Sequence, residues 1–282
     1  MIRGDQNRLF AAYQNSAFKA AKCVDPDFTI AGVNATIRDT NWAKNLMLQG
    51  AKNSCDIVEL HLYSSAWNGF PGDRVSRGVK EALGTADWGK PIWNTECQGC
   101  ASGNCDRPLE PQIGLLYHSI PWVNKFDYNA DADRQMRFII SNLANGMKRI
   151  YLYSARMGRF QMCIMQPAPV LALEQTDGFP SPQLVAHSAL ARRIDGRIFR
   201  EVFEVAPNIW CYLFESQEGT TAVVIPRRFT KSVTIPCALK KVSASDLYGN
   251  PLPLPLQSGN TLRYIEASVN AQTMKRALQK NR

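Results

Sequence analysis

The sequence alternates between strand-like and helix-like segments through its first 196 residues, and this alternation restricts the fold more than any other feature. Apolar and β-branched runs predict buried strands at 28–33, 56–63, 89–96 and 148–154. The segments between and after them predict helices at 5–22, 40–52, within 72–84, at 130–145 and at 181–194. Strands that alternate with helices are normally parallel, because each connection crosses over through a helix. The sequence therefore predicts four βα units in an α/β domain.

After Gly196 the pattern changes to short strand-like runs. They recur about every 8–12 residues and are separated by turn residues such as Pro-Asn, Glu-Gly and Tyr-Gly-Asn-Pro. This spacing is typical of an antiparallel β-sandwich. The last residues, 271–282, are polar and basic, and we expect them to fray.

Composition argues against several classes of partner. The net charge is +9, but the basic residues are dispersed and do not alternate with aromatic residues, so nucleic-acid binding gains no support. No apolar run reaches the roughly 18 residues that a membrane-spanning helix needs. The N-terminal residues also lack the apolar core of a signal peptide.

Eight cysteines fall into two groups. Buried free thiols are expected where the neighbours are apolar, at Cys23, Cys55, Cys163, Cys211 and Cys237. The other group follows the third predicted strand with C-x2-C-x4-C spacing: Cys97, Cys100 and Cys105. A zinc site would need a fourth ligand, and His118 is distant in the sequence. A loop disulfide of an exported protein is the favoured alternative, and a metal-binding function stays open beside it.

The third predicted strand, residues 89–96, ends on the carboxylate of Glu96. The carboxyl end of a strand in a βα chain is where α/β barrels keep their catalytic groups, although a solvated strand-end glutamate has the same pattern. Side chains alternate between the two faces of a strand. The expected faces are Trp93 and Thr95 on one side, and Ile92, Asn94 and Glu96 on the other.

Two further strands carry polar side chains on one face. In residues 56–63 the apolar face is Val58, Leu60 and Leu62, and the opposite face is Ile57, Glu59, His61 and Tyr63. In residues 148–154 the apolar face is Ile150 and Leu152, and the opposite face is Arg149, Tyr151 and Tyr153. Parallel strands that are buried on both faces are usually continuous apolar runs. We therefore expect the polar faces to line a barrel interior or an active site, within a hydrogen-bonded network.

These segments resemble the second half of the barrel in retaining glycoside hydrolases of clan A. His61-x-Tyr63 resembles the motif of the sixth barrel strand, and Glu96 resembles the nucleophile that ends the seventh strand. Tyr153 lies where the clan commonly has an aromatic residue on the eighth strand, and Asn34 would close the fifth. Residues 189–196 resemble the last barrel helix before the small sandwich of β-xylosidase-like and iduronidase-like members. A cellulase-like member is the other interpretation.

The resemblance implies a fold and a set of roles. Residues 1–196 would be a partial (β/α)8 TIM barrel of about four βα units, residues 197–270 an accessory β-sandwich, and residues 271–282 a basic tail. Glu96 would attack the anomeric carbon of an oligo- or polysaccharide, while His61 and Tyr63 hold its carboxylate oriented. The implied substrate-binding residues are His61, Tyr63, Asn34, Tyr153, Trp67 and Trp122. No cofactor and no metal is implied, and clan members of this type are secreted or periplasmic.

One departure from the clan bears on activity. The acid/base glutamate of the clan ends the fourth strand, usually as Asn-Glu, and this dipeptide does not occur in the sequence. We therefore expect an N-terminally truncated glycosidase, which self-associates or lacks the first half of the barrel. Glu59 and Glu110 are the nearest substitutes for the acid. The alternative is an inactive remnant that binds carbohydrate or a protein partner.

Overall fold

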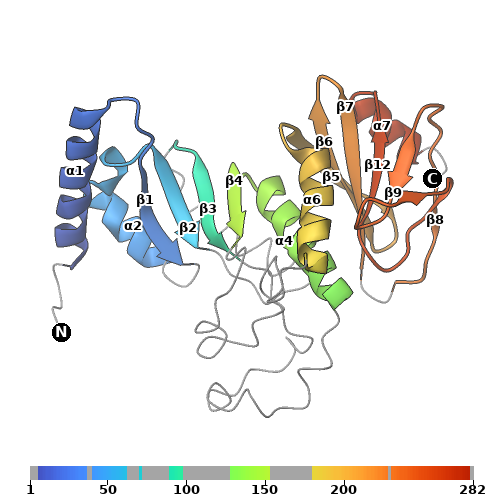
Figure 1. The fold of residues 1–282 in the computed structure, drawn as a ribbon, viewed down its shortest axis with the longest axis horizontal. Helices are drawn as coiled ribbons and strands as arrows, with labels where there is room; N and C mark the ends of the chain where they lie inside the picture. The colour runs from blue at the N-terminus through green and yellow to red at the C-terminus, as the bar shows by residue number, and fades with distance from the viewer. Residues whose placement is uncertain are drawn as a thin grey trace, which may run out of the picture. The chain divides into compact units, whose positions relative to one another are not determined.

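The computed structural model describes residues 6–36, 40–61, 70–71, 89–97, 128–152, 180–227 and 230–279 of the chain. They form two compact units, which are described separately (Figure 1). The first unit contains the N-terminal helices and the parallel strands, and the second contains two later helices and the C-terminal strands. The predicted boundaries at 196/197 and 270/271 stay predictions.

The first unit is built on a four-stranded parallel sheet with the strand order β1-β2-β3-β4. Its strands are β1 (Ala31–Thr36), β2 (Ile57–His61), β3 (Ile92–Cys97) and β4 (Arg149–Leu152). Helix α1 (Gln6–Val24), helix α2 (Thr40–Leu48) and the short 3-10 helix η2 (Ala51–Asn53) belong to the same unit. The parallel arrangement of the four predicted strands is thereby confirmed. The helix expected within 72–84 lies outside the described residues.

Helix α1 docks closely beside β1 and η2. It ends at Val24, just before Asp25-Pro26, because proline disfavours helical backbone in the residue that precedes it. The Gln14 side-chain amide donates to the carbonyl oxygens of Ala51 and Ser54, at 3.4 and 3.2 Å. A Cβ atom on Gly32 would lie 2.4 Å from that amide nitrogen. Glycine at position 32 therefore leaves room for the Gln14 amide in this position.

The second unit has helices on an antiparallel β structure. Helices α4 (Tyr128–Ala144) and α6 (Pro182–Ile194) precede the strands. The strands are β5 (Ile198–Ala206), β6 (Ile209–Ser216), β7 (Gly219–Pro226), β8 (Thr234–Ile235), β9 (Ser243–Ser245), β10 (Pro251–Leu252), β11 (Leu256–Gln257) and β12 (Arg263–Ala267). They form a six-stranded sheet, β10-β9-β12-β7-β6-β5, and a two-stranded sheet, β11-β8. The predicted antiparallel C-terminal part is confirmed.

The C-terminal residues correct one expectation. Residues 271–279 do not fray but form helix α7 (Ala271–Gln279), and Met274 and Leu278 are buried in an apolar core to which strands of both sheets contribute. Glu215 of β6 accepts a hydrogen bond from the backbone nitrogen of Ala271, which satisfies a helix N-terminus that would otherwise lack a partner. The apolar positions recur three to four residues apart, so the polar composition concealed an amphipathic helix.

One predicted burial is also wrong. Cys23 is exposed, because it lies in the last turn of α1 beside Val24, which is 79% exposed. Ile198 is 60% exposed because it begins the edge strand β5. Ile194 of α6 is buried. Among the described helices none is long and apolar enough to cross a membrane.

Candidate active site

The first candidate groups lie at the carboxyl ends of β2 and β3. His61 is the last residue of β2, and Glu96 is the penultimate residue of β3. Parallel neighbours end at the same edge of a sheet, so the two side chains meet there. His61 Nδ1 lies 3.5 Å from Glu96 Oε2, and the side chains are 18% and 35% exposed. The expected proximity of Glu96 to His61 is thus found, in a position that solvent reaches.

An irregularity in β3 brings Glu96 to this face. Glu59 of β2 pairs with Trp93, so Trp93 shares the face of Glu59 and His61. Strict alternation from Trp93 would turn Glu96 to the opposite face. However, the pairing of β3 with β4 shifts by one residue between Asn94 and Cys97. An inserted residue of this kind resets the alternation of side chains, and Glu96 then shares the face of His61.

The predicted faces of β3 therefore need correction. We expected Trp93 and Glu96 on opposite sides of the strand, and the register puts both on the face that carries His61. A similar shift occurs in β1 between Gly32 and Ala35, the interval that contains Asn34. Bulges of this kind are over-represented beside active sites, where they redirect a side chain or end a pairing.

The same face carries a second row of side chains on neighbouring strands, nearer to the amino ends of the strands than Glu96. Trp93 pairs with Glu59 on one side and with Arg149 of β4 on the other. The Arg149 guanidinium carbon lies 4.7 Å from the centre of the Trp93 ring. Tyr151, two residues further along β4, lies 5.8 Å from Trp93 between ring centres, with an angle of 39° between the planes. Tyr151 is 43% exposed, so an aromatic surface faces outward here.

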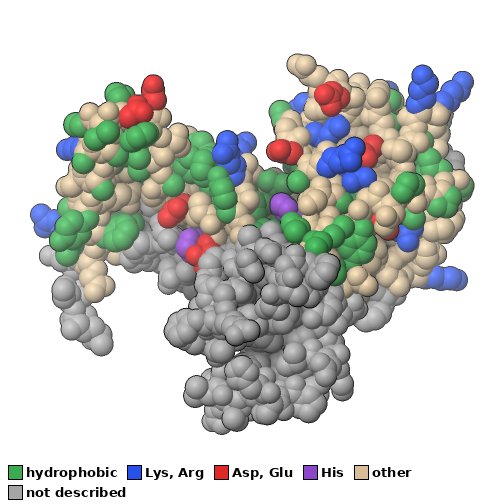
Figure 2. Space-filling view, in the orientation of Figure 1, with side chains coloured by type: hydrophobic (Ala, Val, Ile, Leu, Met, Phe, Trp, Pro, Cys, Tyr) green, Lys and Arg blue, Asp and Glu red, His purple; other side chains and the backbone are tan. Residues whose placement is uncertain are grey.

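The two faces of the sheet differ in burial, as the sequence predicted. Val58, Leu60 and Ile92 are at most 7% exposed on one face. The opposite face is polar and partly open, and Figure 2 shows a histidine beside acidic side chains on the surface of this unit. A face with carboxylates, an imidazole, a guanidinium and aromatic rings can bind a polyhydroxylated ligand through hydrogen bonds and ring stacking.

Not every predicted site residue can be placed. Asn34 lies in β1, at its register shift. Four of the predicted residues lie outside the described part of the chain: Tyr63, Trp67, Trp122 and Tyr153. The assignments of Glu96 as nucleophile and of these residues as sugar ligands stay predictions. Trp93 was missed because strict alternation assigned it to the other face.

The cysteine group after β3 stays a prediction as well. Cys97 ends β3, whereas Cys100 and Cys105 lie outside the described residues. In the described part of the chain, no three His, Cys, Asp or Glu side chains are grouped so that they could hold a metal ion.

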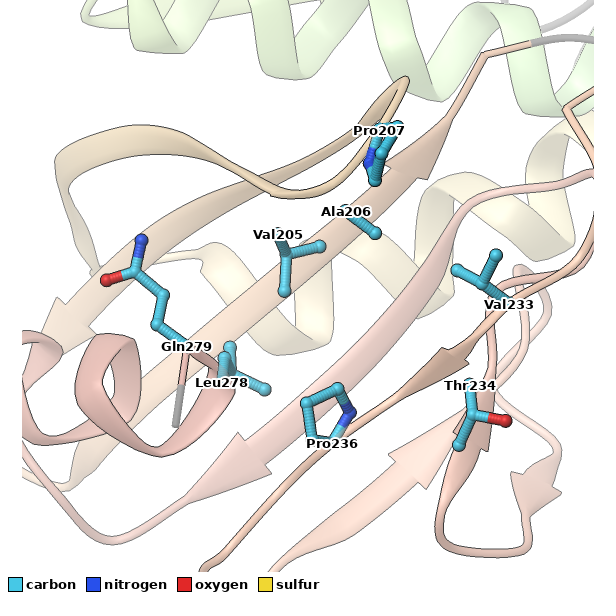
Figure 3. A pocket seen from close by; sticks show the side chains of 8 residues that line it. All are labelled: Val205, Ala206, Pro207, Val233, Thr234, Pro236, Leu278 and Gln279. Carbon is cyan, nitrogen blue, oxygen red and sulfur yellow. The ribbon is translucent and has the colours of Figure 1, made fainter. Parts of the chain in front are cut away.

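A pocket of about 340 Å³ lies in the second unit, between the end of β5, the β8 segment and the last turn of α7 (Figure 3). Val205, Pro236 and Leu278 contribute to its mainly apolar wall, and none of the described residues that line it is ionisable. Among the described residues it therefore offers no general acid or base, and nothing that would activate the Thr234 hydroxyl as a nucleophile.

The sequence matches no protein-family model and no curated protein. Its structure matches a GH39 β-xylosidase from Caulobacter crescentus with a TM-score of 0.54 at 13% identity, over 92% of this chain and 61% of that chain. A GH51 α-L-arabinofuranosidase from Thermotoga petrophila RKU-1 matches with a TM-score of 0.55 at 13% identity, over 94% of this chain and 58% of that one. A GH30 endoxylanase from Clostridium papyrosolvens C71 matches at 0.53 and 13% identity, over 95% and 72%.

At these identities the matches establish the fold and not the activity. The chain spans about three fifths of the length of the β-xylosidase and of the arabinofuranosidase. Over most of its own length its fold is similar to part of the fold of these three glycoside hydrolases, at low sequence identity.

Proposed function

We propose that the chain is a retaining glycoside hydrolase, or part of one, and that Glu96 is its nucleophile. The observation that carries the proposal is the pair formed by His61 and Glu96 at the carboxyl ends of neighbouring parallel strands, 3.5 Å apart and open to solvent. The carboxyl ends of such strands are where α/β barrel enzymes hold their reacting groups. The fold shared with glycosidases supports the same function.

The chemistry begins with attack of the Glu96 carboxylate on the anomeric carbon of the sugar. The bond from that carbon to the leaving oxygen breaks, and an ester joins the sugar to Glu96. Water then attacks the anomeric carbon and passes its proton to the residue that had acted as the acid, and the Glu96 carboxylate is released. His61 orients the carboxylate so that one oxygen faces the sugar, and Tyr151 offers its exposed ring to the apolar face of the sugar.

A retaining enzyme also needs an acid that protonates the leaving oxygen, with the two carboxyl groups about 5–5.5 Å apart. Glu59 is the candidate among the described residues, because it shares the face of Glu96. Glu59 lies two to three residues nearer to the amino ends of the strands than Glu96. At the usual strand dimensions the Cα atoms of Glu59 and Glu96 are therefore about 8–11 Å apart. The side chains must therefore converge. Glu110, the other candidate, lies outside the described residues.

Covalent trapping tests the nucleophile. Aryl 2-deoxy-2-fluoroglycosides with activated leaving groups react without an acid, so they should label the chain even if protonation is weak. Mass spectrometry of the digested protein should find the sugar on Glu96, and Glu96→Gln should abolish labelling and lower turnover by several orders of magnitude. Glu204→Gln, which neutralises an exposed strand glutamate of the other unit, is the matched control. Label on another carboxylate would reject Glu96.

A non-catalytic carbohydrate-binding protein is the second candidate. It is favoured by the sequence itself, which has no Asn-Glu dipeptide of the kind that carries the acid/base in the resembled clan. This function predicts saturable sugar binding that Glu96→Gln leaves intact, with neither turnover nor covalent label. Trapping on Glu96 would exclude it.

We also propose that the sheet recruits a partner, either a second copy of the chain or the remaining strands of a barrel. Within the described residues β1 and β4 form the two edges of the parallel sheet. Unpaired strand edges present backbone donors and acceptors to other strands. Sedimentation velocity on the purified chain tests this, and a monomer at all concentrations would contradict self-association.

A further inference from the structure

Arg149 places a positive charge on the same face of the parallel sheet as Glu96. Arg149 begins β4, is exposed, and lies over the Trp93 ring at 4.7 Å. A contact with a ring leaves the N–H donors of a guanidinium in need of acceptors. Within the described part of the chain, this guanidinium has no carboxylate at ion-pair distance.

Other arginines of the chain form ion pairs with carboxylates. Arg137, Arg193 and Arg200 each lie 2.5–3.1 Å from a carboxylate oxygen. Glu59 is the acidic residue of the row that contains Arg149, but the two occupy strands on either side of β3. Two strand spacings amount to about 10 Å, and no ion pair joins the Glu59 and Arg149 side chains.

The neighbours of Arg149 indicate what kind of anion would bind. Trp93 and the 43%-exposed Tyr151 form an aromatic surface beside it, and aromatic rings stack on the apolar faces of sugars. The row of Tyr151 and Glu96 lies two residues further along the strands, about 7 Å away. In a pyranose the anomeric carbon and a carboxylate on C5 lie closer together than this, so the long side chains of Arg149 and Glu96 would converge on one sugar or contact two neighbouring sugars.

We propose that Arg149, with Trp93 and Tyr151, forms a subsite for a uronic acid, a sugar that carries a carboxylate. The planar guanidinium fork binds the carboxylate through two N–H donors, and the aromatic surface supports the ring. Glu96 then faces the anomeric end of the same sugar or of its neighbour. This proposal rests on the proposed function for the position of the anomeric carbon, but the binding itself does not require turnover.

A matched set of ligands tests the subsite. Methyl glucuronide, in both anomeric forms, is compared with methyl glucoside and methyl glucoside 6-sulfate, which differ from it at C6. Binding to the full 15N-labelled chain is followed at millimolar ligand by the indole signals of its tryptophans. The glucuronide should bind more tightly than the glucoside, and its affinity should fall with added salt because the contact is exposed.

Arg149→Gln should lower the glucuronide affinity by about tenfold or more and leave the glucoside unchanged, since a charge-assisted pair is lost. Arg8→Gln, the same change on the exposed surface of α1, is the control and should change neither. Equal binding of glucuronide and glucoside, no binding of either, or an Arg149→Gln variant that behaves like the control would overturn the proposal. Tighter binding of the sulfate than of the glucuronide would overturn the assignment to a carboxylate.

Failure of this proposal and failure of the proposed function give different results. If Arg149 selects the glucuronide but Glu96 is never labelled, the subsite stands and the hydrolase is rejected. If neutral fluoroglycosides label Glu96 and Arg149→Gln has no selective effect, the hydrolase stands and the subsite is rejected. Glu96→Gln should retain glucuronide binding in either case, because Glu96 lies in the row beyond Arg149.

Discussion

Arg137→Met should be among the most destabilising single substitutions in the second unit. Arg137 lies on α4, is 3% exposed, and its Nε donates to Asp133 at 2.7 Å. Its terminal nitrogens donate to the carbonyl oxygens of Pro226 and Asn260, at 2.6 and 3.4 Å. The other oxygen of Asp133 accepts from the backbone nitrogen of Leu262. This network joins α4 to two separate turns of the β structure.

The expected loss of stability follows from the groups that lose their partner when Arg137 is replaced. Methionine fills much of the same space but has no donor, so Asp133 keeps a charge in a buried position without its partner. Removing one member of a buried ion pair costs about 3–5 kcal/mol. The carbonyl oxygens of Pro226 and Asn260 also lose a charged donor, which makes the upper part of that range the expectation.

Urea unfolding followed by circular dichroism measures the effect. The double variant Asp133→Asn/Arg137→Met removes the stranded charge while asparagine keeps an acceptor for Leu262. It should therefore be more stable than Arg137→Met, by about 1–3 kcal/mol. Arg192→Met, an exposed position on α6, should change the free energy of unfolding by less than about 0.5 kcal/mol. A loss below about 1 kcal/mol for Arg137→Met would refute the reasoning.

Three further substitutions test the fold. Leu278→Ala should cost about 2–5 kcal/mol, since this side chain of α7 is 1% exposed, and a thermal melt equal to that of the unsubstituted chain would mean that the C-terminal residues fray. The backbone nitrogen of Ala271, at the start of α7, donates a hydrogen bond to Glu215 of β6 and lowers the pKa of that carboxyl. Glu215→Gln should therefore lower the free energy of unfolding by about 0.3–1 kcal/mol at neutral pH. The pKa of Asp56 is lowered chiefly by the backbone hydrogen bond from Ile30, so its contribution is present above the unfolded-state pKa and is lost on acidification. Asp56→Asn should therefore destabilise at pH 7, and the difference should close below about pH 4 in urea melts at several pH values, whereas a constant difference would contradict the reasoning.

Local pattern predicted more of the fold than of the site. The candidate pair, His61 and Glu96, was predictable because each lies near the carboxyl end of a predicted strand, and parallel strands end at a common edge. Arg149 and Tyr151 were expected on the polar face of their strand. The face of Trp93 was predicted wrongly, because strict alternation of side chains takes no account of a β-bulge. The inserted residue in β3 depends on hydrogen bonds to β4, more than fifty residues away in the sequence.

The sequence by itself determined the four parallel strands and the change to antiparallel strands after Gly196, because periodicity and turn residues act over a few neighbouring positions. Tertiary structure decided which side chains share a face and which segments are buried. The polar residues from 271 onward form α7 because Met274 and Leu278 find a core to enter. Glu96 shares the face of His61 because β3 pairs out of simple register with β4. Both outcomes depend on contacts between distant parts of the chain, and such contacts leave no periodic signal in the residues around them.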